Sequence, residues 1–158
     1  MKEAGLTHGG FYAHFASRNA LLAEAMDRAW RDSAARTKKD IRSKPARGAS
    51  PFRALVESYL SDRHVSETEY GCPLAALASE IPRQTPEVRT VAAHWVRDML
   101  ATVQQALPDA QPDRCALIAT QLVGTVQLAR ALGGSDERKA LLAAARRDLL
   151  SQYDKKSL

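Results

Sequence analysis

The sequence predicts an all-α protein, and three observations lead to that class. Alanine and leucine are plentiful while aromatic residues make up only 6% of the 158 residues, a balance that favours helices. Apolar residues recur at spacings of three and four along most of the chain, which is the period of an amphipathic helix. No segment alternates between apolar and polar residues, and no Asn-Gly or Asp-Gly turn joins two apolar runs.

The most informative motif is the stretch Leu6–Arg18, near the start of the chain. Gly5 follows a short helical tail and allows the positive φ that ends one helix and begins a tight turn. Thr7 is a good N-cap for the next helix, because its hydroxyl can accept an unpaired backbone N–H. Leu6 and Phe11 are spaced as a hydrophobic staple. The pattern is that of the second half of a helix-turn-helix.

This motif resembles the recognition helix of the TetR family of transcriptional repressors. The residues that agree with the family pattern are Thr7, Gly9, Phe11, Tyr12, His14, Phe15 and Arg18. The resemblance implies a ligand-responsive repressor that binds operator DNA as a homodimer and is released by a small molecule. It also implies phosphate contacts, or support for them, from Thr7, Tyr12, His14 and Arg18. Such contacts position a protein on DNA without reading its sequence.

The face of this helix that would enter the DNA groove is almost bare. Its two phenylalanines point together towards the core, and the opposite face carries Gly9 and Ala13, with Gly10 and Tyr12 beside them. A bare face lets the backbone approach DNA closely, and the alanine methyl can contact a thymine methyl. His8, at the start of the helix, is the side chain best placed for a base edge. The alternatives are a solvated His8, and packing of Tyr12 and His14 against the following helix.

The start of the chain departs from the family pattern. Only four residues precede Gly5, too few for the helix that braces a recognition helix. Either the natural protein begins upstream and Met1 is an internal methionine, or the chain is truncated. We favour the first, because Leu6–Arg18 keeps every feature needed to use DNA. If Met1 is the true start, the alternative is a DNA-blind dimeric helical module that binds a ligand or a partner.

The remaining chain is expected to form a linking helix and then a bundle. Residues 1–35 would hold the end of the helix-turn-helix and a linking helix capped by Ser17, with an apolar stripe of Leu22, Ala25, Met26, Ala29 and Trp30. Residues 50–155 would form an effector-binding and dimerisation domain. Its helices are predicted to begin at Ser50-Pro51, Gly71-Cys72-Pro73, Thr85-Pro86, Pro112 and Ser135. They are predicted to end near His64, Ile81, Leu107, Leu132 and Tyr153, where the tail is expected to fray.

The helix Pro112–Leu132 differs from the others, because it carries no charge between Ala116 and Ala129. A helix that is apolar nearly all round must be buried on more than one face. In the TetR family the last two helices usually form a four-helix bundle with their twins, and the resemblance implies that role for Pro112–Leu132 and Ser135–Tyr153. The alternative is a central core helix of a monomer.

The positive charge of the chain is concentrated in one segment. The whole chain carries a net charge of +5, whereas Arg28–Arg47 alone holds eight basic and two acidic side chains. Such a segment can attract nucleic acid phosphate. The alternative is a solvated helix end and loop.

No motif identifies the small-molecule effector. The sequence has no phosphate loop, no GxGxxG and no metal-ligand spacing, so no cofactor is expected. Candidates for the ligand pocket are aromatic, sulfur and amide side chains on expected inward faces: Tyr59, Cys72, Trp95, Met99, Gln121 and Thr125. For Gln121 and Thr125 the alternative is a bond across a dimer interface or to their own backbone.

A more specific hypothesis, a reactive thiol, concerns Cys72, because this residue directly precedes a predicted helix. Helix N-termini lower the pKa of a thiol, and a reactive thiol could sense oxidants or electrophiles. The alternative is a small buried residue. Cys115 lies in the largely apolar helix and is expected to be structural.

Several classes of function are not expected from this sequence. The four histidines show no spacing to carboxylates or nucleophiles that indicates catalysis, so an enzyme is not expected. No apolar run approaches the roughly 18 residues of a membrane span, so no membrane partner is expected. The start lacks a signal-peptide pattern, which predicts a cytoplasmic protein.

Overall fold

The computed structural model describes residues 14–43, 49–67 and 71–154, and these ranges contain helices but no strand. The long helices within them are α2 (Arg18–Ser43), α6 (Pro86–Ala106), α7 (Pro112–Ala131) and α8 (Asp136–Tyr153). The short ones are α3 (Pro51–Tyr59), α4 (Asp62–Ser66), α5 (Pro73–Leu77) and the 3-10 helix η2 (Ile81–Arg83). The all-α class predicted from the sequence is confirmed.

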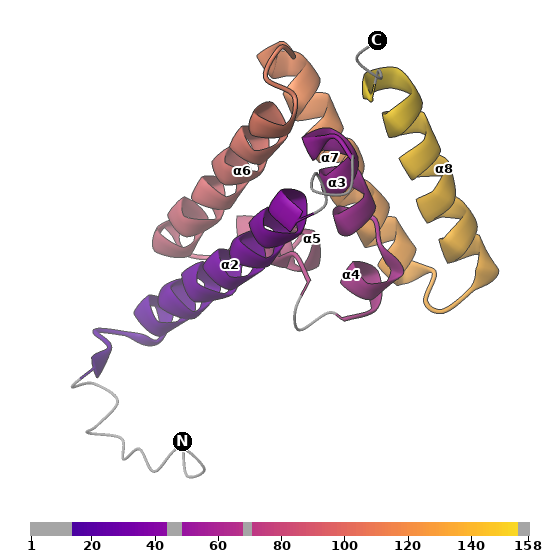
Figure 1. Ribbon diagram of the computed structural model, residues 1–158. Helices are drawn as coiled ribbons and strands as arrows, with labels where there is room; N and C mark the ends of the chain where they lie inside the picture. The colour runs from indigo at the N-terminus through magenta and orange to yellow at the C-terminus, as the bar shows by residue number, and fades with distance from the viewer. Residues whose placement is uncertain (1–13, 44–48, 68–70, 155–158) are drawn as a thin grey trace.

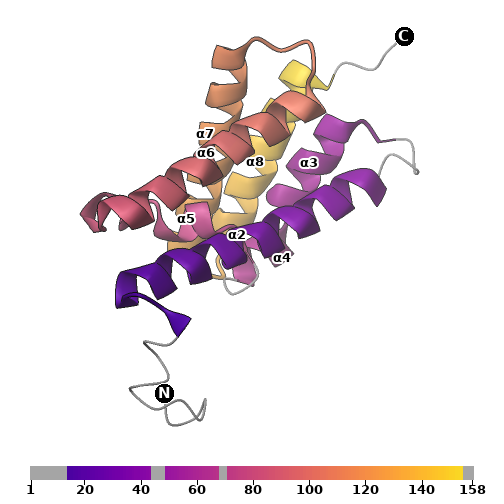
Figure 2. The same cartoon turned by 90° about the vertical axis from the view of Figure 1, so that its left-hand side faces the viewer.

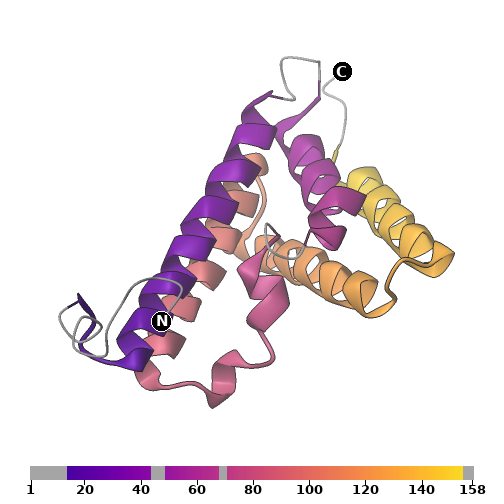
Figure 3. The same cartoon turned by 90° about the horizontal axis from the view of Figure 1, so that it is seen from below.

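The long helices form two pairs, with the short helices between them (Figure 1). α2 and α6 lie side by side in one pair, and α7 and α8 lie side by side in the other. α3 contacts both α2 and α8, and α5 contacts both α2 and α7, so the short helices join the two pairs (Figures 2 and 3). α6 also packs against α7, which places one hydrophobic core at the centre.

Capping residues explain most of the helix boundaries. Proline stands at the first turn of α3, α5, α6 and α7, where its missing N–H costs nothing. Gly133, with φ +64°, takes the left-handed conformation just after α7. Four serine hydroxyls accept the backbone N–H three residues further on: Ser17 (3.0 Å), Ser50 (3.0 Å), Ser61 (3.2 Å) and Ser135 (3.2 Å). The predicted helix starts at Ser17, Ser50 and Ser135 are therefore confirmed.

Helix α2 is longer than predicted, and it buries a different face. It runs to Ser43 rather than to the mid-thirties, because Ile41 packs against the core and Asp40 Oδ2 accepts a hydrogen bond from Ser58 Oγ at 2.6 Å. The side chains that it buries are Ala23, Met26, Trp30 and Ser33. The predicted stripe is wrong for the other three residues, since Leu22, Ala25 and Ala29 are exposed. Two apolar faces run along this helix, and its neighbours α3 and α6 cover only one.

Two tryptophans join α2 to α6. Their rings stack with centroids 5.7 Å apart and an interplanar angle of 10°. Trp95 is fully buried, and Trp30 Nε1 donates a hydrogen bond to Asp98 Oδ2 at 2.8 Å. This pair combines a large buried area with one charge-assisted hydrogen bond.

Two predicted helices are each shorter in the structure. The helix expected to run to His64 is interrupted at Ser61, whose hydroxyl caps a new helix, α4. The helix expected to reach Ile81 ends at Leu77 and is followed by η2. Pro82 explains that ending, because a proline cannot continue the α-helical hydrogen bonds.

The last turn of α8 is held against the start of α3. The rings of Tyr153 and Phe52 pack edge to face with centroids 5.9 Å apart. The Asp154 carboxylate pairs with Arg53 Nη2 at 2.5 Å and accepts a hydrogen bond from Ser50 Oγ. The predicted fraying is therefore wrong for Tyr153 and Asp154, while residues 155–158 lie outside the described ranges.

Helix α7 buries one face and leaves another exposed within the single chain. Ile118, Leu122 and Val126 are fully enclosed by the core. Leu117 and Leu128 are 60% and 62% exposed. None of the helices in the described ranges is long and apolar enough to cross a membrane.

The predicted stripe of α2 includes both Leu22 and Met26, whereas the structure buries only Met26 of these two. One alanine substitution at each position tests which side chain stabilises the fold. Met26→Ala should lower the free energy of unfolding by about 2–5 kcal/mol, because it opens a cavity in the core. Leu22→Ala should cost less than about 1 kcal/mol, because that side chain is 38% exposed. Urea denaturation followed by circular dichroism measures both. A larger loss from Leu22→Ala would contradict the packing of α2.

Candidate functional site

Four polar side chains meet in the interior, each from a different element. Tyr59 ends α3, His64 lies in α4, Cys72 is the N-cap of α5, and Arg130 lies in the last turn of α7. The rings of Tyr59 and His64 are in contact, with centroids 4.6 Å apart. Tyr59 and Cys72 are each 3% exposed. We call these four residues the polar cluster.

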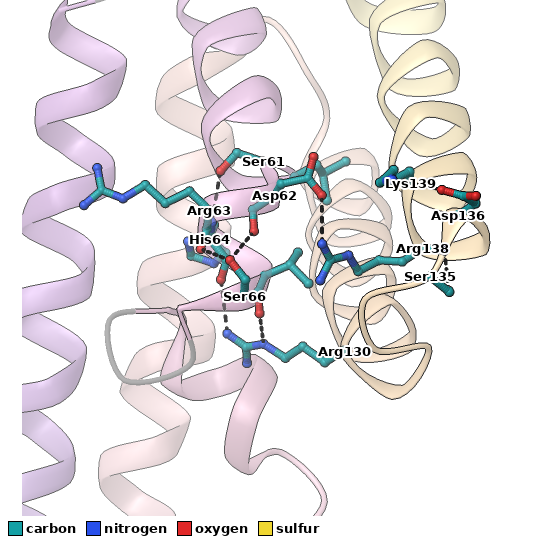
Figure 4. Close-up of polar contacts among 12 residues, drawn as sticks. Ser61, Asp62, Arg63, His64, Ser66, Arg130, Ser135, Asp136, Arg138 and Lys139 are labelled. Atoms are coloured by element: carbon teal, nitrogen blue, oxygen red, sulfur yellow. Dashed lines mark hydrogen bonds and ion pairs between the residues drawn. The ribbon is translucent and has the colours of Figure 1, made fainter.

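Arg130 holds the backbone around this cluster together. Its Nη2 donates to the carbonyl oxygen of His64 and its Nε to that of Val65, both at 3.4 Å (Figure 4). These carbonyls belong to α4, where a helix C-terminus favours a cation. A Cβ atom at Gly71 would overlap the Arg130 guanidinium and lie 3.0 Å from the His64 carbonyl oxygen. A side chain at residue 71 would therefore force the Arg130 guanidinium to move.

The cluster presents hydrogen-bonding groups that are buried and unused. His64 Nε2 and Arg130 Nη1 have no hydrogen-bond partner among the residues that the structure describes, whereas the buried Tyr59 hydroxyl interacts with the Cys72 thiol. Buried polar atoms are nearly always paired in folded proteins. Arg130 forms no ion pair with a carboxylate in the described part of the chain, where the oxygens that it contacts are the two carbonyl groups.

The His64 imidazole and the Tyr59 phenol are uncharged at neutral pH. Burial lowers the pKa of His64 from 6.5 to about 4, and the nearby cations Arg130 and Arg36 act in the same direction, while Asp40 opposes them. Burial also raises the pKa of Tyr59 well above its ordinary value, with a further contribution from Cys72. These two side chains therefore add no charge to the cluster.

A cavity of about 440 Å³ lies beside the cluster, between α2 and the segment of α3 and α4. His64 forms part of its wall, so this residue borders both the cavity and the polar cluster. The hydroxyl groups that line it belong to Ser33, Thr37, Ser58 and Ser61. Charged side chains of both signs complete the lining: Arg36, Lys39, Asp40, Arg63 and Glu67.

The residues that the sequence proposed for a ligand pocket separate into three groups. Tyr59 and Cys72 meet in the polar cluster. Trp95 and Met99 of α6 and Thr125 of α7 are buried in the core. Gln121 is only half-buried, and its Nε2 donates to Asp148 Oδ2 of α8 at 3.0 Å in an exposed contact.

Sequence reasoning missed two members of the cluster. His64 was considered only as a catalytic residue, and nothing nearby in the sequence marks it as a partner of Tyr59. Arg130 was not singled out, since a basic residue in the last turn of a helix is common. The signal that could have found it is position, because Arg130 is the first charge after the uncharged run Ala116–Ala129.

Most of the proposed DNA-contacting residues, Thr7, His8, Gly9, Gly10, Tyr12 and Ala13, lie outside the described residues. His14 and Arg18 are described and exposed, and Arg18 is the first residue of α2. Along a helix with a rise of 1.5 Å per residue, Arg42 lies about 36 Å from Arg18.

The described basic side chains of the segment Arg28–Arg47 lie at different places along α2. Arg28 pairs with Asp32 at 3.0 Å and Arg31 with Asp27 at 2.7 Å, all on the exposed surface of α2. Lys38, Lys39 and Arg42 are exposed at the far end of α2 from Arg18. The residues after Ser43 in this segment lie outside the described ranges.

The two cysteines are both buried free thiols. Cys72 lies at the start of α5 as predicted, and its side chain caps no backbone N–H. The Cys115 thiol lies 3.3 Å from Gln104 Oε1, to which it donates, and burial raises its pKa. Selective reactivity of Cys72 stays a prediction. In the described ranges no group of histidine, cysteine and acidic residues is arranged to hold a metal ion.

The buried imidazole makes stability depend on pH in a defined direction. In the unfolded chain His64 takes up a proton near its ordinary pKa of 6.5, whereas in the folded protein it does so only at about 4. The unfolded state therefore binds more protons in this window, and stability is lost as pH falls. The loss attributable to His64 between pH 7.5 and 5 should reach about 2 kcal/mol.

Urea unfolding of His64→Gln and of the parent protein at both pH values measures this loss as a difference between the two proteins. His94→Gln is the matched control, because that histidine is exposed on α6. Equal pH dependence in the His64 variant and the parent would contradict the buried, neutral imidazole.

Comparison with known protein families adds an independent observation. Residues 48–149 match the family described as tetracyclin repressor-like, C-terminal domain. A search of curated proteins found no match. The matched range covers α3 to α8 except the last turns of α8, and so includes the whole polar cluster. Because it makes up more than half of the chain, the protein belongs to the TetR family of regulators.

Proposed function

We propose that this protein is a ligand-responsive transcriptional repressor that binds operator DNA as a homodimer and is released by a small molecule. The observation that carries the proposal is the polar cluster, where His64 and Arg130 each keep a buried hydrogen-bonding atom unpaired. Such a site has a reason to exist if another molecule completes it.

The cluster is well placed to act on the DNA-reading segment. His64 borders a cavity whose other wall is the second half of α2, and α2 begins at Arg18, the last of the proposed DNA-contacting residues. Ser58 and Asp40 tie α3 to the same part of α2. A ligand that binds more tightly to one arrangement of α4 and α2 would shift the protein towards that arrangement.

We propose that the chain has a DNA-reading part and an effector-binding part. Residues 1–35 would carry the DNA-reading segment and most of α2, and residues 50–155 would bind the effector and dimerise. Because α2 packs against α3 and α6, it would belong to the same core as the effector-binding part. DNA contacts are assigned to Thr7, His8, Gly9, Gly10, Tyr12, Ala13, His14 and Arg18.

The dimer is proposed to form through α7 and α8. Leu117 and Leu128 are the most exposed large apolar side chains of the described residues, and both lie on α7. Gly124 lies between them, with open space around its missing side chain. Ala140 and Ala144 are exposed on the adjacent α8. Small and apolar residues on two adjacent helices suit close packing against a second copy.

A charge on this face should break the dimer without unfolding the chain. Leu128→Glu places a carboxylate where the single chain is open, so the monomer tolerates it, but a dimer would bury it unpaired. Light scattering after size-exclusion chromatography should report a dimer for the parent and a monomer for the variant. Val96→Glu on α6 is the control, because that exposed position lies on another helix. A monomeric parent at micromolar concentration would refute the dimer.

DNA binding is tested with two arginines at opposite ends of α2. Arg18→Ala should weaken binding by a similar factor on all sequences and reduce the salt dependence by about one phosphate contact. Arg42→Ala removes the same charge about 36 Å away and should change little. Fluorescence anisotropy with selected duplexes measures both variants, in the chain alone and with in-frame residues upstream of Met1.

The same assay decides between the repressor and the alternative function. A repressor should bind a palindromic duplex and leave it when a ligand that binds the protein is added. Failure of both forms to bind any duplex would leave a DNA-blind dimeric ligand-binding or interaction module. Equal losses from Arg18→Ala and Arg42→Ala would contradict the assignment of DNA contacts to the start of α2.

A further inference from the structure

We propose that a second copy of this chain binds in one register, with α7 antiparallel on the partner's α7 and α8 antiparallel on the partner's α8. This inference rests on the proposed function, because it names the side chains by which the proposed dimer recognises itself. It is carried by the side chains exposed on the two helices, by their relative positions, and by the side of the molecule on which α2 begins.

The exposed face of α8 carries two small residues between two opposite charges. Ala140 and Ala144 are exposed at its centre, and the exposed Glu137 and Arg147 precede and follow them by one turn. Spacings of three and four residues place these side chains along one stripe of the helix. In an antiparallel pair of α8 helices centred at residue 142, Glu137 lies opposite the partner's Arg147, twice by symmetry. Ala140 lies opposite the partner's Ala144, so the two helices can approach closely.

The exposed face of α7 carries a leucine beside an open space. Leu128 is 62% exposed, and Gly124 lies one turn before it, with no atom within 4 Å of the position that a Cβ would take. In an antiparallel pair of α7 helices centred at residue 126, each Leu128 lies against the partner's Gly124. A leucine side chain that fills the space over a glycine gains the apolar contacts that it lacks in the single chain.

The relative positions of α7 and α8 allow one two-fold axis to serve both pairings. Gln121 Nε2 donates to Asp148 Oδ2 at 3.0 Å, and Arg114 Nη1 donates to Tyr153 Oη at 3.2 Å. The helices run in opposite directions with the same rise per residue, so positions that lie level can be counted from these contacts (Figure 1). Residue 142 of α8 is level with residue 127 of α7 from the first contact and with residue 125 from the second. The centre of the α7 pairing, residue 126, lies between these two values.

The position of α2 distinguishes the two directions that a two-fold axis in this interface can take. Figures 1 and 3 show the start of α2 and α8 at opposite sides of the molecule, with α7 between them. An axis that runs across the helices, from the α7 side to the α8 side, keeps both copies of α2 on one side of the dimer, where one DNA duplex can meet both. An axis along the helices would place α7 on the partner's α8 and carry the two α2 helices to opposite sides.

Charge exchange tests the register of α8. Glu137→Arg and Arg147→Glu should each raise the dimer dissociation constant on the order of tenfold, because each brings like charges together at two symmetric positions. The double variant Glu137→Arg/Arg147→Glu restores both ion pairs and should return to within about twofold of the parent. Lys139→Glu is the control, because this exposed residue of α8 lies off the stripe and pairs with Asp136. Analytical ultracentrifugation measures these proteins, and a double variant that shows the losses of both single variants would overturn the pairing.

Disulfide cross-linking tests the direction of the axis. Ala140→Cys/Ala144→Cys should give a covalent dimer on a non-reducing gel after mild oxidation, because these positions face each other across the proposed axis. Leu117→Cys/Ser151→Cys should give no covalent dimer. These two exposed positions lie level on α7 and α8, so they meet between chains only if α7 lies on the partner's α8. The parent is the control, since both of its cysteines are buried.

The outcomes separate the register from the proposed function. A covalent dimer of Leu117→Cys/Ser151→Cys, or none of Ala140→Cys/Ala144→Cys in a dimeric protein, would overturn the register and keep the homodimer. A monomeric parent would overturn both. A protein that shows the expected cross-links but binds no DNA would keep the register and refute the repressor.

Discussion

One arginine side chain organises the centre of this protein. Arg130 stands at the end of an apolar helix, and its guanidinium reaches the last carbonyl groups of α4. The α4 segment thus held includes His64, whose ring contacts Tyr59, and a side chain at residue 71 would displace the Arg130 guanidinium. Three segments that are distant in sequence meet around one charge because a buried cation must find oxygen atoms.

The contact between Arg130 and α4 also connects the interior to α2. His64 is held by its own carbonyl to α7, while its ring borders the cavity that α2 closes. The stacked tryptophans fix α2 to α6, so α2 is part of the core rather than a loose connector. Occupation of the cluster would act first at the boundary between α4 and α2, because His64 contacts Tyr59 and also borders the cavity beside α2.

Much of the fold could be predicted from local patterns. Serine caps, prolines in first turns and the glycine after α7 act within a few residues, so the helix starts at Ser17, Ser50 and Ser135 needed no tertiary information. The site could be predicted only in part. Tyr59 and Cys72 carried suitable chemistry on expected inward faces, whereas His64 and Arg130 gain their meaning from neighbours that lie elsewhere in the chain.

The sequence by itself determined the all-α class, most helix starts and the resemblance to a family, since these depend on residue type and short spacing. Only the tertiary structure decided which face of α2 is buried, that α2 continues to Ser43, and that Tyr153 and Asp154 are held in place. It also decided that Gln121 faces α8 while Tyr59 meets His64. The reason is physical: a helix with two apolar faces, or a polar group within reach of several partners, takes the arrangement that its packed neighbours allow.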